Sequence, residues 1–166
     1  NYTFTNDGTR NAPLMMQTII DTGGTDTIDL SNQTKSSTLN MSGGTLSSIG
    51  IWSEADQVAY WEAQTGLSNA TVQGHFDFYN NQATSNYPGK TTSSIYTGAD
   101  NLGIAFNAQI ENAVGGSADD TITGNDLDNM ITGGGGNDTI DGGDGDDVAI
   151  FSGDRNSYTI NTSGST

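Results

Sequence analysis

The chain contains no cysteine, which excludes disulfide bonds and thiolate metal sites. No apolar run approaches the roughly 18 residues of a membrane span, and no signal peptide opens the chain. We therefore expect no direct membrane insertion, and we interpret the chain as a piece of a longer protein. Basic residues are also scarce: four Lys and Arg face twenty Asp and Glu, giving a formal net charge of −16. Nucleic acid is excluded as a partner because its phosphates would be repelled.

Residues that could perform catalysis are equally few. A catalytic zinc site needs several His or Cys ligands, and the only histidine is His75. The chain has no GxSxG segment, no glycine-rich stretch followed by Lys-Ser or Lys-Thr, and no loop with the Gly and Glu positions of an EF-hand. We therefore predict a protein that is not an enzyme.

Glycine and aspartate are abundant instead, and they follow a nine-residue period. Four back-to-back repeats read GGSADDTIT (115–123), GNDLDNMIT (124–132), GGGGNDTID (133–141) and GGDGDDVAI (142–150). Their pattern is GGxGxDxUx, where U is apolar. A disordered acidic linker is the alternative for such composition, but a linker would not keep Ile122, Ile131 and Ile140 in register. We predict a parallel β-roll, with six residues of each repeat in a turn and three in a short strand.

This pattern favours calcium. Two repeats make one coil, so turns two repeats apart stack, which places Asp120 above Asp138 and Asn129 above Asp147. Glycines let carbonyl oxygens point inward, and the sixth residue adds a carboxylate, which suits the oxygen ligands that Ca²⁺ prefers. Without metal, like charges about 4 Å apart repel by about 1 kcal/mol in water and about 4 kcal/mol at an effective dielectric near 20. Folding should therefore require several Ca²⁺ ions.

The predicted calcium ligands of the repeats are all turn residues. They are Gly115, Asp119, Asp120, Asp128, Asn129, Gly133, Gly135, Asn137, Asp138, Gly142, Asp144, Asp146 and Asp147.

The rest of the chain is predicted to be mainly β. Two β-branched runs flank a Gly-Gly turn between Thr18 and Ser31, and alternating residues from Ser37 to Met41 precede a second Gly-Gly turn. Residues 103–114 favour a strand pair or a short strand leading into the repeats. The predicted fold is therefore a β-roll, or β-solenoid, packed with additional strands.

One short helix is predicted within residues 52–67. Ser53 is its candidate N-cap and Gly66 its natural stop. Ala55, Val58, Ala59 and Glu62 fall on one face, and Asp56 is interpreted as an exposed acid of the first turn.

We expect a single calcium-dependent domain over residues 1–166. Its parts are a β region (1–51), an insertion with the short helix and aromatic loops (52–97), a second β region (98–114), the β-roll (115–151), and a closing strand and tail (152–166).

Several stretches resemble the C-terminal region of serralysins, secreted bacterial zinc proteases that carry an RTX calcium-binding β-roll. They are IIDTGGTDTIDLS (19–31), GGTLSSIG (43–50), IENAVGGSADDTITGN (110–125) and the repeats. The resemblance implies further calcium ligands at Asp21, Gly23, Gly24, Asp26, Gln109 (through its carbonyl) and Glu111. The family's Arg-x-Gly-x-Thr segment, which helps hold an ion on Asp21, would lie before Asn1. The resemblance carries over no catalytic residue, because the zinc protease domain has no counterpart here.

Residues 52–97 look like an insertion relative to serralysins. Large bacterial RTX adhesins contain a peptide-binding module that is similar to this region but lacks a protease, and the chain resembles such a module. The resemblance implies type I secretion and an extracellular localisation, either secreted or on the bacterial cell surface. It also implies that the partner is a peptide or protein on a target cell surface. We expect it to be monomeric within a longer chain. The alternative is the C-terminal folding and secretion domain of a serralysin-like metalloprotease or another secreted hydrolase.

The insertion supplies the predicted ligand-binding residues, because aromatic anchors with a few polar groups are what a peptide site needs. They are Trp52, Trp61, Phe76, Asp77, Phe78, Tyr79, Asn80, Tyr87 and Asp100. The alternative is that these aromatic residues form a small satellite core under the roll.

Overall fold

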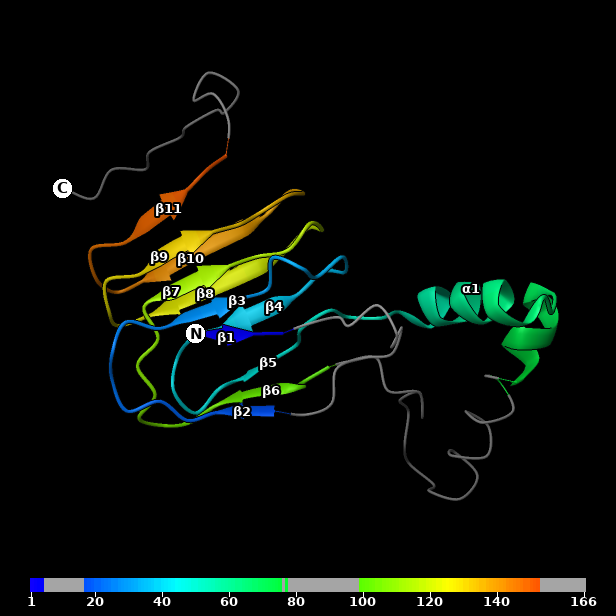
Figure 1. Ribbon diagram of the computed structural model, residues 1–166, viewed down its shortest axis with the longest axis horizontal. Helices are drawn as coiled ribbons and strands as arrows, with labels where there is room; N and C mark the ends of the chain where they lie inside the picture. The colour runs from blue at the N-terminus through cyan, green and yellow to red at the C-terminus, as the bar shows by residue number, and fades with distance from the viewer. Residues whose placement is uncertain (5–16, 76, 78–98, 153–166) are drawn as a thin grey trace.

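The computed structural model describes residues 1–4, 17–75, 77 and 99–152. Short strands lie in three sheets, and all pairings but one between strands are parallel (Figure 1). The five-stranded sheet has the order β1 (Tyr2–Thr3), β3 (Thr27–Asp29), β7 (Asn112–Val114), β9 (Met130–Thr132) and β11 (Val148–Ile150). A second sheet has the order β10 (Thr139–Gly143), β8 (Thr121–Asn125) and β4 (Thr38–Asn40). The third has the order β2 (Gln17–Ile19), β6 (Leu102–Ile104) and β5 (Leu46–Ser47), with β5 antiparallel to β6.

The four repeats form a parallel roll, as predicted. Ile140 pairs with Ile122 across β10 and β8, and Ala149 pairs with Ile131 across β11 and β9. Each pair is two repeats apart, so the coil of two repeats is confirmed. Successive repeats contribute their strands to opposite sheets, because each turn reverses the direction of the chain.

The roll also continues toward the N-terminus, beyond the predicted repeats. Ala113 of β7 pairs with Ile131, and Ile28 of β3 pairs with Ala113. On the other sheet, Leu39 of β4 pairs with Ile122. Residues 21–29, 32–40 and 106–114 therefore act as further half-coils, although only DTGGTDTID (21–29) keeps the glycines, acid and apolar residue of a repeat.

The core lies between the two faces of the roll. The apolar position of each inner half-coil is buried, and Ile28, Leu39, Ile122 and Ile131 are at most 1% exposed. Burying a side chain of this size contributes about 1.5–3 kcal/mol. Ile140 is only partly buried because no described coil covers it.

The insertion begins with α1 (Glu54–Thr65), which Figure 1 shows projecting from the side of the roll. Its predicted ends are confirmed: Ser53 forms a capping box with Asp56, and Gly66 closes the helix with φ 68°. The predicted apolar face is wrong, since Ala55 and Ala59 are exposed and only Val58 is buried. Alanine methyl groups bury too little area to hold a helix against a neighbour.

A second helical stretch follows at residues 69–75, so the prediction of a single helix was wrong. In the described part of the chain, no helix has the length and apolar character to cross a bilayer.

The entry to the insertion and its exit meet on the roll. The Ile49 backbone N–H donates to Asn101 Oδ1 at 2.8 Å, and Asn101 Nδ2 donates to the Ile49 carbonyl at 2.8 Å. Asn101 is 2% exposed, so this reciprocal pair is shielded from water. The strands on either side are therefore joined without help from the insertion.

Candidate calcium site

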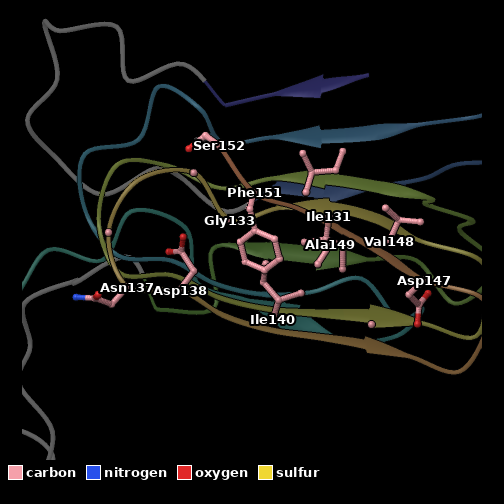
Figure 2. A pocket seen from close by; sticks show the side chains of 14 residues that line it. Ile131, Gly133, Asn137, Asp138, Ile140, Asp147, Val148, Ala149, Phe151 and Ser152 are labelled. Atoms are coloured by element: carbon pink, nitrogen blue, oxygen red, sulfur yellow. The ribbon is translucent and has the colours of Figure 1, made fainter. Parts of the chain in front are cut away.

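The sixth residue of each half-coil lies in one of two columns, at opposite edges of the roll. Figure 2 shows Asn137 and Asp138 at one edge and Asp147 at the other, with Ile131 and Ile140 between them. The register places Ser37, Asp120 and Asp138 in the first column and Asp26, Glu111, Asn129 and Asp147 in the second. The predicted stacking of Asp120 on Asp138 and of Asn129 on Asp147 is confirmed.

Backbone N–H groups hold these carboxylates in place. The Asp120 N–H donates to Asp138 Oδ1 at 3.0 Å, and the Asn129 N–H donates to Asp147 Oδ1 at 3.0 Å. The same bond joins the Asp26 N–H to Glu111 Oε2 at 2.8 Å. Each acid is thereby fixed against the turn of the preceding coil.

Asp120 is the most deeply buried acid of the repeats, at 2% exposed. Burial raises the pKa of Asp120 above its ordinary value, and the nearby charges of Asp138 and Asp119 add to this effect. Hydrogen bonds from the Gly116 and Ser37 backbone N–H groups oppose it but do not cancel it. A buried carboxylate in this setting is stabilised by a cation.

Glycine lets each turn close tightly around its own acid. A Cβ on Gly133 would collide with the Asp138 carboxylate, and one on Gly142 would collide with that of Asp147. Gly134 and Gly136 adopt φ of 101° and 102°, which other residues rarely do. The turns are therefore oxygen-lined cradles that a larger side chain would fill.

These turns suit calcium better than a transition metal. In the described residues, single carboxylates lie beside backbone carbonyls, and no three Asp, Glu or His side chains come together as a metal cluster. The oxygens are hard and their number is flexible, as Ca²⁺ requires. Asp138 and Asp147, with the carbonyls of their stacked turns, are the residues that fit the ion best.

The ligands implied by the serralysin resemblance lie in two neighbouring half-coils, 21–29 and 106–114. Asp21 Oδ1 accepts the N–H groups of Thr22 and Gly23, at 2.7 and 3.2 Å, whereas Asp21 Oδ2 is buried with no hydrogen-bond partner. Gln109 lies against Gly23, and Glu111 holds the Asp26 N–H. A buried carboxylate oxygen without a donor is what a bound cation would satisfy. Gly24 lies in the same turn, within reach of the Asp26 carboxylate.

Most of the other predicted ligands are exposed residues of the turns. Asp119 Oδ1 accepts the Asn137 N–H at 2.7 Å, and Asp128 Oδ1 accepts the Asp146 N–H at 2.9 Å. These two bonds join neighbouring coils. Gly135 and Asp144 are exposed. Gly115 is buried and packs against the Gly133 carbonyl of the coil that follows.

The predicted ligand-binding residues do not form one site in the described part of the chain. Trp52 is buried, at 8% exposed; it packs edge-on against Tyr60 and lies under the Lys35 ammonium. Trp61 is 48% exposed. Asp77 and Asp100 are exposed on separate segments. The remaining predictions, Phe76, Phe78, Tyr79, Asn80 and Tyr87, lie outside the described residues.

Two contributors were not predicted from the sequence. Ser37 occupies the sixth position of a half-coil, and its backbone N–H donates to Asp120 Oδ1 at 2.7 Å. Gln33 accepts the Ser117 N–H through its carbonyl at 3.0 Å. The half-coil 32–40 has no glycine and no acid, so no sequence signal identified it.

Comparison with protein families agrees with this geometry. The family model for the RTX calcium-binding nonapeptide repeat matches four copies over residues 112–149, well under half of the chain. No curated protein matches the chain. RTX repeats bind Ca²⁺, occur in secreted bacterial proteins, and generally form non-catalytic structural modules. The cofactor predicted from the repeats is therefore confirmed.

Proposed function

We propose that the chain is a non-catalytic, extracellular, calcium-dependent binding module of an RTX adhesin. In this proposal the roll is a scaffold, and the inserted segment recognises a peptide or protein on a target cell surface. The observation that carries the proposal is the Ile49–Asn101 pair, which closes the roll on itself where the insertion leaves and returns. A segment that the scaffold does not need for its own strands is free to serve recognition.

The insertion is nevertheless held in a definite place. Lys35 of the roll forms an ion pair with Asp56 and lies 5.1 Å from the centre of the Trp52 ring. Trp52 contacts Tyr60 at 6.2 Å between ring centres, and Tyr60 contacts Trp61 at 5.4 Å. The exposed Trp61 thus contacts Tyr60, which in turn packs against the buried Trp52. A rigid aromatic anchor of this kind loses little entropy on binding.

The test is a peptide-library screen in millimolar calcium. It compares the wild-type module with a variant in which residues 53–97 are replaced by a short Gly/Ser linker, and with Trp61→Ala. The matched control is Leu46→Ala, which removes an exposed apolar side chain from β5, outside the insertion. Peptide binding should disappear in the linker variant, weaken in Trp61→Ala and persist in Leu46→Ala.

Two other outcomes of the peptide screen would contradict the proposal. Equal binding by the linker variant and the wild type would place recognition on the roll. Absence of any peptide ligand, with all four proteins folded, would favour the second candidate, a folding and secretion domain of a serralysin-like protease or another secreted hydrolase. The observation in favour of that candidate is Asp21 Oδ2, a buried carboxylate oxygen without a hydrogen-bond partner at a position where the resemblance to serralysins implies a calcium ligand.

A further inference from the structure

Asn129 breaks a rule that the other described sixth-position residues follow. At four junctions, a sixth-position side chain accepts the backbone N–H of the sixth-position residue that precedes it in the same column. In each bond the first residue donates its backbone N–H and the second accepts through its side chain: Ser37 to Asp120, Asp120 to Asp138, Asp26 to Glu111, and Asn129 to Asp147. The junction between Glu111 and Asn129 is different, because Asn129 reaches back with a donor.

The hydrogen bonds fix the orientation of the Asn129 amide. Its Oδ1 accepts the Asn125 N–H at 2.9 Å, just as Asp120 Oδ2 accepts the Gly116 N–H at 2.7 Å. Its Nδ2 must then point the other way. That nitrogen donates to the carbonyls of Ile110 and Glu111 and to Asn125 Oδ1, each at 3.2 Å.

Three oxygens therefore converge on one amide nitrogen, and the side chain is only 2% exposed. A carboxylate at the same place would bring a fourth oxygen and a negative charge into a buried group of acceptors. Such a group is stable only with a cation or with donors. Here the amide supplies the donors.

Asn125 completes the arrangement. It occupies the second position of its repeat, opposite Gly143 in the next coil, where the repeat pattern calls for glycine. Its Nδ2 donates to the Ile110 carbonyl at 2.8 Å, and its Oδ1 accepts from Asn129. Both departures of this repeat from the pattern thus serve one small amide network around the Ile110 carbonyl.

We propose that the amides of Asn129 and Asn125 replace a calcium ion at this junction. The junction then joins the N-terminal half-coils to the repeats without metal, while the stacked turns that carry Asp138 and Asp147 depend on calcium. The inference rests on the calcium binding of the repeats and is independent of any peptide ligand. It predicts that a single atom exchange, Asn129→Asp, creates a calcium site.

Equilibrium dialysis against calcium counts the ions bound per folded chain, and circular dichroism gives the calcium concentration at half-folding. Asn129→Asp should bind one ion more than the wild type and need more calcium for half-folding, yet fold fully at saturation. Asn69→Asp is the matched control, because it adds the same charge at an exposed position in the second helical stretch, outside the roll. It should bind the wild-type number of ions.

Asn129→Ala removes the amide without adding a negative charge, so it tests the amide hydrogen bonds alone. It should bind the wild-type number of ions but need several-fold more calcium for half-folding, because the Asn125 N–H loses its acceptor and the Ile110 and Glu111 carbonyls each lose one of their donors. The proposal is overturned if Asn129→Asp binds no additional ion, or if it stays unfolded at saturating calcium while Asn129→Ala folds. It is also overturned if Asn129→Ala folds at the wild-type calcium concentration.

Discussion

Asp138 lies at the sixth position of the third repeat, where its carboxylate accepts the Asp120 N–H and fills the cradle formed by Gly133. Truncation by Asp138→Ala removes a predicted ion ligand and leaves that N–H without its partner. Loss of a buried hydrogen-bond partner costs about 1–3 kcal/mol, and the weakened ion site adds to this. We expect a lower melting temperature in millimolar calcium and a higher calcium requirement for folding.

The control for Asp138→Ala is Asp126→Ala, which removes an exposed acid from a neighbouring turn. Asp56, an exposed acid by its sequence position, cannot serve as this control, because the structure pairs it with Lys35. Equal melting temperatures for Asp138→Ala and Asp126→Ala would contradict the assignment of Asp138 to an ion site.

Two adjacent glycines offer a second comparison at the residue scale. Gly136 has φ of 102°, and a Cβ there would lie 2.6 Å from the Ala118 carbonyl carbon. At Gly135, a Cβ would meet nothing closer than 3.6 Å. Holding alanine in the left-handed region costs about 1–3 kcal/mol. Thermal denaturation should therefore show Gly136→Ala clearly destabilised and Gly135→Ala close to wild type, and the reverse order would refute the turn geometry.

At the scale of elements, Lys35 fastens α1 to the roll. The Lys35 and Ser53 side chains hold the pKa of Asp56 below its ordinary value of 3.8. A lowered pKa in the folded state means that the contribution to stability is present above pH 3.8 and is lost as the pH falls through the lower, folded-state pKa. Since both side chains are partly exposed, the pair contributes only roughly 0–1 kcal/mol.

Lys35→Met keeps most of the side chain's length and removes the charge. The Asp56 carboxyl should then titrate closer to pH 3.8, which NMR of the side-chain carboxyl can follow in saturating calcium. Trp52 fluorescence should change as well, because Lys35 lies over its ring. An unchanged Asp56 titration would show that Ser53 alone accounts for the shift.

The repeats could be predicted closely from the sequence because their physics is local. Glycine, aspartate and an apolar residue at fixed spacing determine both the turn and its partner two repeats away. The alternating residues from Ser37 to Met41 predicted the strand of the half-coil 32–40. Its place in the roll could not be predicted, because the half-coil has neither glycine nor acid and joins the roll through Leu39 and backbone hydrogen bonds to distant residues. The burial of Trp52 also depends on tertiary contacts, which spacing along the chain does not encode.

At the scale of the whole molecule, the chain combines a formal net charge of −16 with a thin core. The metal binding energy of such a fold is part of its folding energy, and extracellular calcium modules work at about 10⁻⁴–10⁻³ M. We therefore expect a chelator to unfold the repeats and millimolar calcium to restore them. Circular dichroism measures this directly, with magnesium at equal concentration as the control, and a spectrum that stays folded in chelator would disprove the calcium requirement.

The register of the roll has a mechanical consequence. One coil of eighteen residues advances the stack by a single strand spacing, which is about 4.8 Å. The same eighteen residues pulled straight span roughly 60 Å. An unfolded, extended coil is therefore about twelve times as long as the folded coil is high. In a protein under tension, withdrawal of calcium would let the repeats unfold and extend coil by coil. Return of calcium would let them refold and shorten the chain again.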